Sequence, residues 1–391
     1  MVHGRRQSVS AIVAAVACGQ TSASEMVEEA LVGIRRRDGA VNAFCAVWEE
    51  WARDRAAEVD AAVARGAELP LAGVPIGVKR SEGTASFQAR RLVAAGAVPV
   101  GATAVPGPGT EWKTWGSTDC GPTVNPRRPG LSPGGSSAGS GAAVAAGLVP
   151  LATASDGAGS TRIPAAWCSV VGYKPTSGRM PARDAAGLTV GGPIARRVGD
   201  ADLYRRVVLG ERPTTDGHGR AEPRRKAGPL RVAWSATLGF NRVHAGVAET
   251  AAGALGEWER SGAITVHEAG LDLDDPGARW RALRASPALR PAGDGMWGGD
   301  RNAARLAELF AEFDLLATPA TPNPPHGPQG PGEAMSVGLT WLFNLTGHPA
   351  VSVPAGFLDD GAPVGLQLVA DPHDDEALLR AAADYEAGVL D

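Results

Sequence analysis

Residues 131–176 decide the fold, and their sequence is LSPGGSSAGSGAAVAAGLVPLATASDGAGSTRIPAAWCSVVGYKPT. Two clusters of small residues, Gly134-Gly135-Ser136-Ser137 and Asp156-Gly157-Ala158-Gly159-Ser160, flank a run of small apolar residues. Glycine clusters are expected where the backbone approaches another group closely or adopts unusual dihedral angles. The serines are therefore candidate nucleophiles, although a turn or a helix cap at Ser136 or Ser137 would need the same residue types.

Around this stretch, short apolar runs alternate with helical patterns along the whole chain. Helices are predicted within 8–66 and at 81–96, 140–147, 247–261, 301–312 and 375–385. Strands are predicted at 71–78, 98–102, 148–154, 230–234, 263–267, 314–318, 350–353 and 364–369. The alternation favours a single large α/β domain whose central mixed, mostly buried sheet is covered by helices on both faces.

Within this domain, residues 1–391, three parts are expected. They are N-terminal helices (1–66), a catalytic core (67–200) and a C-terminal, substrate-side half (229–391), with a polar surface connection at 212–228. Arg5-Arg6 and the apolar run at 11–18 weakly resemble an export signal. The run is short and Gly19 ends it, so we interpret it as the first helix of the domain.

The composition excludes several classes of partner. The formal net charge is −4 and charged residues make up 20% of the chain, which argues against nucleic acid or an anionic membrane as a partner. The 4 cysteines are far apart and form no CxxC pair, so neither a disulfide framework nor a metal site is indicated. We expect no cofactor and a reducing, cytoplasmic location.

Lys79 is the candidate base for a serine nucleophile. It ends the predicted buried strand at 71–78, and burial lowers the pKa of a lysine because it disfavours the ammonium. Taken alone, however, a lysine at a strand end more commonly extends to solvent.

Two other interpretations of the small-residue clusters, a nucleophile elbow and a phosphate-binding loop, are disfavoured. Residues 135–139 match G-x-S-x-G, but the nucleophile elbow needs a strand directly before it, and 125–133 contain three prolines instead. A phosphate-binding loop needs a Gly-Lys-Ser/Thr ending, which is absent.

The whole pattern resembles the amidase signature family of serine hydrolases. Its motifs occur in the family's order over nearly the whole chain. The matching segments are 72–79, 134–137, 156–164, 172–176, 192–196, 344–349, 353–356 and 363–367.

The resemblance implies a role for each residue of the site. It implies that Ser160 is the nucleophile, that Ser136 is a bridging serine after a cis peptide bond, and that Lys79 is the base. The backbone N–H groups of Gly157, Ala158, Gly159 and Ser160 would form an oxyanion hole. Supporting positions match Ser137, Asp156 and Arg162.

The chain departs from the family pattern at several positions. Ala158 replaces a glycine, and Arg80 replaces an aspartate after the lysine, where an inward-pointing cation would lower the pKa of Lys79 further. The segment from Lys79 to Ser136 and the region 272–301, with Trp280 and Trp297, look shortened. We therefore expect an open site, or one that a partner completes.

The expected function is hydrolysis of a small-molecule or acyl amide through an acyl-enzyme on Ser160. An amide-forming acyltransferase that uses the same residues, with a carrier-bound acyl donor, is a first alternative. A non-catalytic, partner-binding homologue is a second. A homodimer and the identity of the substrate stay open.

Overall fold

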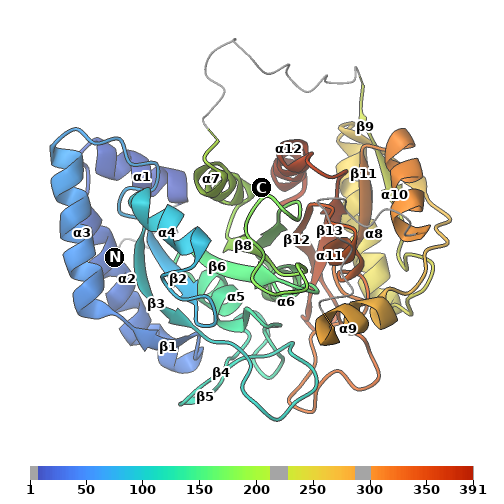
Figure 1. The fold of residues 1–391 in the computed structure, drawn as a ribbon, viewed down its shortest axis with the longest axis horizontal. Coiled ribbons are helices and arrows are strands. Elements are labelled where there is room, and N and C mark those ends of the chain that lie inside the picture. The colour runs from blue at the N-terminus through green and yellow to red at the C-terminus, as the bar shows by residue number, and fades with distance from the viewer. Residues whose placement is uncertain (1–7, 212–227, 287–300, 391) are drawn as a thin grey trace.

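The computed structural model of the chain describes residues 8–211, 228–286 and 301–390. They form a single α/β fold around a large mixed sheet, as the sequence predicts. Figure 1 shows the sheet extending across the molecule, from α1, α2 and α3 on one side to α9 and α10 on the other.

The main sheet of the described residues has 11 strands. In spatial order they are β1 (Phe44–Val47), β3 (Val98–Thr103), β2 (Pro75–Lys79), β6 (Leu151–Asp156), β8 (Val190–Ala195), β7 (Val171–Lys174), β12 (Ala350–Phe357), β13 (Pro363–Val369), β11 (Leu315–Pro319), β9 (Leu230–Trp234) and β10 (Ile264–Glu268). A small separate hairpin joins β4 (Ser117–Thr118) and β5 (Gly121–Pro122).

Parallel pairing occurs in two groups of three strands, one in each half of the sheet. Strands β3, β2 and β6 are mutually parallel, and so are β11, β9 and β10. The strands between these groups pair antiparallel. Because parallel neighbours end at the same edge, β2 and β6 bring their last residues together.

Helices cover both faces of the sheet. Their bounds are α1 (Val9–Ala17), α2 (Ala23–Arg37), α3 (Glu49–Ala64), α4 (Phe87–Ala94), α5 (Ala138–Ala145), α6 (Arg162–Cys168), α7 (Val198–Leu209), α8 (Ala245–Arg260), α9 (Gly277–Ala285), α10 (Arg301–Glu312), α11 (Leu342–Leu345) and α12 (Asp375–Tyr385). The short helices α5 and α6 pack against each other and against strands from β2 to β13. Their alanines and glycines permit this close approach.

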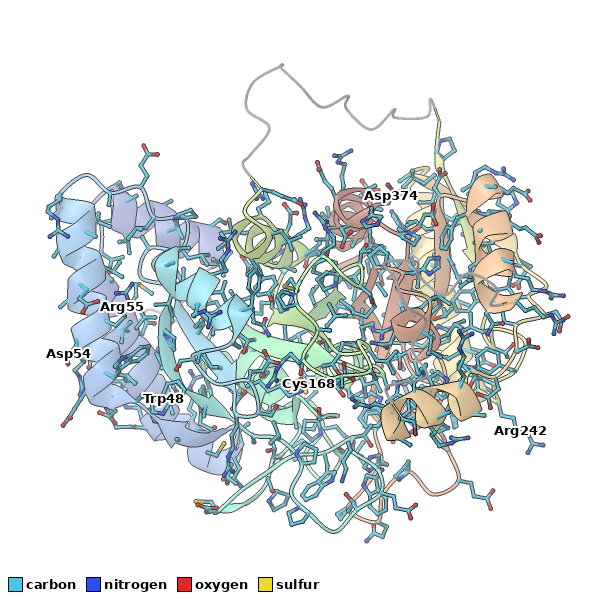
Figure 2. All side chains as sticks on the ribbon, viewed as in Figure 1. Trp48, Asp54, Arg55, Cys168, Arg242 and Asp374 are labelled. Carbon is cyan, nitrogen blue, oxygen red and sulfur yellow. The ribbon has the colours of Figure 1, made fainter. Side chains whose placement is uncertain are left out.

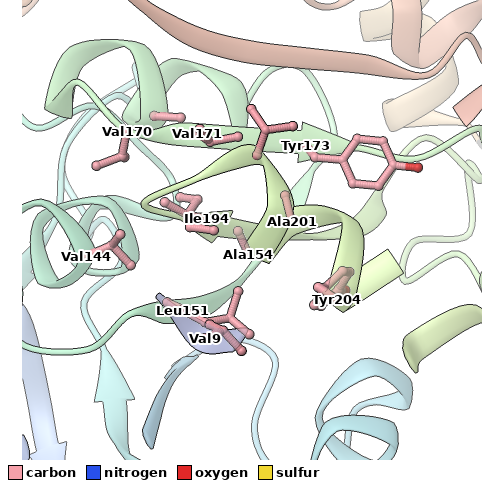
Figure 3. Close-up of a cluster of buried hydrophobic side chains, with 14 of the residues drawn as sticks. Val9, Val144, Leu151, Ala154, Val170, Val171, Tyr173, Ile194, Ala201 and Tyr204 are labelled. Atoms are coloured by element: carbon pink, nitrogen blue, oxygen red, sulfur yellow. The ribbon is translucent and has the colours of Figure 1, made fainter. Parts of the chain in front are cut away.

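The apolar core joins the N-terminal helices to the sheet. Figure 3 shows Val9, Val144, Leu151, Ile194 and Tyr204, from α1, α5, β6, β8 and α7, in one buried cluster. The Val9 N–H also donates to Asp200 Oδ1 at 2.9 Å. The apolar run at 11–18 is therefore largely helix α1, packed into the fold as expected.

The sequence missed several elements. Residues 44–47 form edge strand β1 inside the region predicted to be all helical, and α6, α7, α9, β7 and β8 were not predicted. The predicted connection at 212–228 lies outside the described residues except for Gly228. No helix of the described chain is long and apolar enough to cross a membrane. Figure 2 shows Asp54 and Arg242 projecting outward, whereas Cys168 is buried.

Candidate active site

The candidate active site lies where β2 and β6 end side by side. Gly77 of β2 pairs with Ala152 of β6 in parallel register, so the two strands end at the same edge. Lys79 is the last residue of β2, and Asp156 is the last residue of β6.

Lys79 is buried and its ammonium group contacts two serines. Nζ is 3.0 Å from Ser136 Oγ and 3.0 Å from Ser155 Oγ, and a longer contact of 3.4 Å reaches the Ser155 carbonyl oxygen. The Lys79 N–H donates to Thr153 Oγ1 at 2.9 Å, which fixes the strand end. Lys79 does not extend to solvent, so the sequence-based alternative is wrong.

The environment of Lys79 favours its neutral form. Burial lowers the pKa of Lys79, Glu82 opposes this shift, Arg183 adds to it and Asp156 opposes it; together they bring the pKa to about 8. A lysine with this pKa is far more readily neutral than a free lysine and can act as a base in mildly alkaline solution.

Ser136 is presented by a loop rather than by a strand. The Gly135-Ser136 peptide bond is cis. A Cβ atom on Gly135 would lie 2.2 Å from the Lys113 carbonyl oxygen, so only glycine fits there. Ser137 directly precedes α5, but its side chain makes no capping bond; its Oγ accepts from the Ser155 backbone nitrogen at 3.5 Å. The capping alternative is therefore wrong for the Ser137 side chain.

Asp156 organises the loop that leads to Ser160. Its carboxylate accepts the Gly159 N–H at 2.6 Å and the Thr161 N–H at 3.2 Å, and it forms a fully buried ion pair with Arg162 at 2.8 Å. Burial alone would raise the pKa of Asp156, but Arg162 outweighs burial and holds the pKa well below its usual range.

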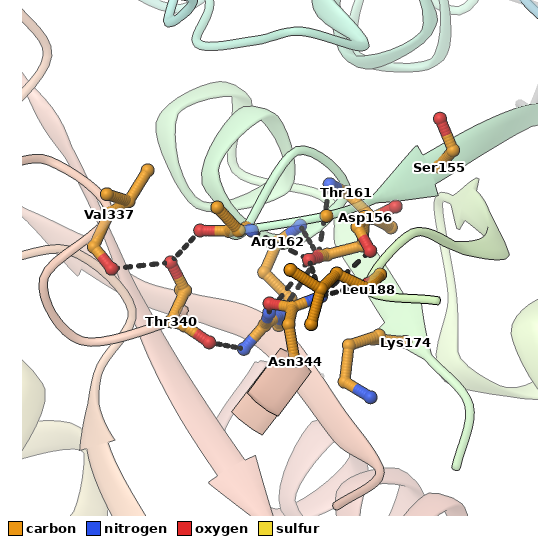
Figure 4. A network of polar contacts seen from close by, with 12 residues as sticks. Ser155, Asp156, Thr161, Arg162, Lys174, Leu188, Val337, Thr340 and Asn344 are labelled. Carbon is orange, nitrogen blue, oxygen red and sulfur yellow. Dashed lines mark hydrogen bonds and ion pairs between the residues drawn. The ribbon is translucent and has the colours of Figure 1, made fainter. Parts of the chain in front are cut away.

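Arg162 ties this loop to the C-terminal half of the chain. Its guanidinium donates to the Thr340 carbonyl oxygen at 3.0 Å and to Asn344 Oδ1 at 2.8 Å (Figure 4). It also donates to Gln367 Oε1 at 2.7 Å. Asn344 and Gln367 lie in segments that match the family pattern, but nothing in those segments predicts that they pair with Arg162.

The loop backbone has one position that only glycine can occupy. Gly159 has a φ of +121°, and a Cβ there would lie 2.3 Å from Thr340 Oγ1. Ala158 is not among the residues with positive φ, so its side chain carries no such penalty. Because the Gly159 N–H already donates to Asp156, the expected oxyanion hole is left with the N–H groups of Gly157, Ala158 and Ser160.

A cavity of about 740 Å³ opens over these groups. Lys79, Ser136, Ser155 and Ser160 all line it, and Ser160 is half-buried. Its opposite wall comes from α9 and from residues 331–337 with Trp341. The structure therefore brings the two candidate serines and the lysine to one cavity, together with Ser155, which the sequence did not single out.

The structure refines two sequence expectations about the residues around the cavity. Arg80 is exposed, and the cation that acts on Lys79 is Arg183. The region 272–301, which looks shortened in the sequence, contains helix α9, whose Trp280 Nε1 donates to the Gly157 carbonyl oxygen at 2.7 Å. Trp297 lies outside the described residues.

Comparison with known proteins identifies the family of this chain. The model of the family described as Amidase matches residues 80–279 and 300–379. The chain belongs to the amidase family. An acylamidase of Rhodococcus erythropolis is 33% identical, covering 97% of this chain and 95% of the relative. That alignment has 460 positions, more than the 391 residues of this amidase, so the relative carries segments that are missing here.

Solved structures of the family share the fold. A 6-aminohexanoate cyclic dimer hydrolase with bound substrate has a TM-score of 0.77 at 27% identity, covering 98% of this amidase and 97% of that chain. A bacterial aryl acylamidase described as an amidase signature enzyme has a TM-score of 0.78 at 24% identity, covering 98% and 96%. The chain is thus an enzyme of the class that hydrolyses carbon–nitrogen bonds of amides.

Proposed function

We propose that this amidase cleaves its substrate through an acyl-enzyme on Ser160, with Ser136 and Lys79 as the proton relay. The observation that carries the proposal is the contact of 3.0 Å between Lys79 Nζ and Ser136 Oγ, at the edge of the cavity that Ser160 also lines. A buried lysine with a pKa of about 8, bonded to a serine that shares the cavity with the candidate nucleophile, supports a Ser-Lys variant of the catalytic triad.

In the acylation step, Ser160 Oγ forms a bond to the amide carbonyl carbon. Its proton passes to Ser136 Oγ while the proton of Ser136 passes to neutral Lys79. The negative charge that develops on the carbonyl oxygen would be stabilised by the N–H groups of Gly157, Ala158 and Ser160. One such donor contributes about 3 kcal/mol in other acyl-transfer enzymes.

The carbon–nitrogen bond then breaks. Lys79 returns a proton through Ser136 to the nitrogen, so the leaving group departs as an amine or ammonia. Water next attacks the ester carbonyl of the acyl-enzyme and gives its proton to the same relay. The carboxylic acid is released and Ser160 is regenerated with its proton.

The cavity favours a small amide with an apolar or aromatic part. Its volume of about 740 Å³ lies within the range of sites that bind small molecules. Three indole rings line the cavity, those of Trp112, Trp280 and Trp341. Its described lining comes from several separate segments of the chain. This supports a small-molecule or acyl amide as substrate, and a carrier-bound acyl group is a further candidate to test.

Labelling and substitution of Ser160 test the proposal. A fluorophosphonate should label wild-type protein at Ser160, and Ser160→Ala should lose both labelling and turnover of amides. The panel should contain N-acyl amides and a cyclic amide, since relatives are named acylamidase and cyclic dimer hydrolase. Unchanged turnover in Ser160→Ala would refute the assignment.

Trapping with hydroxylamine separates the remaining alternatives. Release of free acid indicates a hydrolase, whereas a hydroxamate shows that the acyl group can pass to an amine, as an acyltransferase requires. Absence of both products, together with no labelling of Ser160, would favour the partner-binding homologue.

A further inference from the structure

The Lys79 ammonium contacts only uncharged oxygen atoms within the described chain. Ser136 and Ser155 supply them, and no carboxylate lies within hydrogen-bond distance of Nζ. The pKa of Lys79 therefore depends on its burial and on charged groups that lie too far away to form a hydrogen bond with Nζ. Those charges are Glu82 after β2, Arg183 between β7 and β8, and Asp156 of β6, which is itself paired with Arg162 of α6.

Glu82 is held close to Lys79 but cannot reach Nζ. Its N–H donates to the Lys79 carbonyl oxygen at 2.8 Å, and its side chain is fully buried. One carboxylate oxygen accepts from Arg183 at 2.6 Å, and the other accepts from Gln88. Gln88 also donates to the Ala154 carbonyl oxygen at 2.9 Å and accepts from the Tyr204 hydroxyl. Glu82 is thus a fixed carboxylate three residues after the lysine.

Arg183 carries the opposite charge and borders the cavity. Its Nη2 donates to the Ser81 carbonyl oxygen at 2.6 Å, and its side chain is 35% exposed. It lines the catalytic cavity together with Lys79. One member of this ion pair therefore lies in the turn directly after Lys79, and the other lies in the wall of the cavity that Lys79 lines.

We propose that Glu82 and Arg183 are positioning residues that set the protonation of Lys79 by acting on it in opposite directions. Glu82 stabilises the ammonium form, and Arg183 stabilises the neutral form because it repels the ammonium. This inference rests on the proposed function in one respect, that neutral Lys79 is the active base. The sequence had given this role to Arg80, which points to solvent.

The opposed signs give a distinctive pattern of pH dependence. Neutral Lys79 predominates above pH about 8, so kcat/KM should rise with pH through that value. Arg183→Met removes a repulsion, so the midpoint should move to higher pH. Glu82→Gln removes an attraction, so the midpoint should move to lower pH. Each shift should be about half a unit to one unit.

The experiment measures the midpoint in two independent ways. One is the pH profile of kcat/KM on an amide that the wild-type enzyme turns over. The other is NMR titration of the Lys79 13Cε resonance in lysine-labelled protein, assigned by its absence in Lys79→Met. Arg183→Lys keeps the charge and should restore the wild-type midpoint. Arg80→Gln is the matched control, an exposed arginine next to Lys79, and should not move it.

Opposite shifts in Arg183→Met and Glu82→Gln would support the proposal. Shifts of the same sign, or none, would overturn it. If Glu82→Gln does not fold, the difference between Arg183→Met and Arg183→Lys decides alone. Opposite NMR shifts with an unmoved pH profile of kcat/KM would support the electrostatic inference and refute the base role. Turnover that needs Ser160 and Lys79, with unmoved midpoints, would refute only the inference.

Discussion

The two sides of the catalytic cavity are built in different ways. On one side, Lys79 and Asp156 end neighbouring parallel strands, and their partners Ser136, Ser155 and Arg162 are fixed by several hydrogen bonds each or by a loop that only glycine can form. The opposite side consists of α9 and residues 331–337 with Trp341, where indole rings and exposed arginines form the wall.

This difference separates chemistry from selectivity. The strand side holds its charged groups in buried contacts below about 3.5 Å, which suits groups that must transfer protons. The opposite wall contacts the strand side through few polar bonds, chiefly Trp280 to Gly157 and Arg284 to Asp184. We expect substitutions on the strand side to abolish turnover, and substitutions in the wall to change which amide is accepted.

The largest effect should come from Lys79→Met. It removes the base but keeps the side-chain length, so kcat/KM should fall about 10³-fold or more. Lys174→Met is the matched control: Lys174 is also buried, with a pKa lowered to about 7 by burial and Arg162, but its Nζ contacts the Pro175 carbonyl oxygen. Equal losses of kcat/KM in both variants would mean that burial, rather than contact with Ser136, explains the result.

Asp156→Asn should lower stability strongly. It leaves Arg162 buried without its counter-ion, which costs about 3–5 kcal/mol of unfolding free energy. Asp184→Asn breaks the partly exposed pair with Arg284 in the wall and should cost at most about 1 kcal/mol. Urea unfolding followed by circular dichroism measures both, and similar losses would contradict the distinction between the two sides.

Much of the strand side could be predicted from the sequence. Serines, glycines and a lysine at a strand end form a pattern because the backbone geometry tolerates few residue types there, as Gly135 and Gly159 show. The wall could not be predicted in this way. A tryptophan such as Trp280 or Trp341 could pack on any apolar surface of the fold. Its position in the cavity depends on contacts with residues that are distant in the sequence. The bond of Arg162 to Gln367 could not be predicted for the same reason, because 205 residues separate the two.

Trp280→Phe should have a moderate effect on turnover. It removes the bond from the indole to the Gly157 carbonyl oxygen, worth about 1 kcal/mol, so kcat should fall about fivefold with little change in KM. Trp341→Phe is the control, because the Trp341 indole N–H has no hydrogen-bond partner in the described chain. If kcat is unchanged in Trp280→Phe, α9 does not help to position the nucleophile loop.

Trp112→Ala should have the smallest effect, and only on some substrates. Trp112 lines both the catalytic cavity and a second cavity of about 340 Å³ bordered by Leu131, Pro133 and His326. Removing the indole should join the two spaces and lower KM several-fold for amides with long apolar groups. Steady-state kinetics over a series of chain lengths tests this; the shortest amide is the internal control, and a uniform change in KM would argue against it.

The hydrogen bonds of Arg162 also affect when the nucleophile loop can fold during synthesis. Its partners Thr340, Asn344 and Gln367 follow it by 178, 182 and 205 residues, and Gln367 belongs to the last strand of the sheet. During synthesis the N-terminal half therefore emerges with the nucleophile loop unfinished, because contacts this distant form late in folding. We expect a ribosome-bound chain to stay unreactive toward fluorophosphonates until β13 has left the exit tunnel.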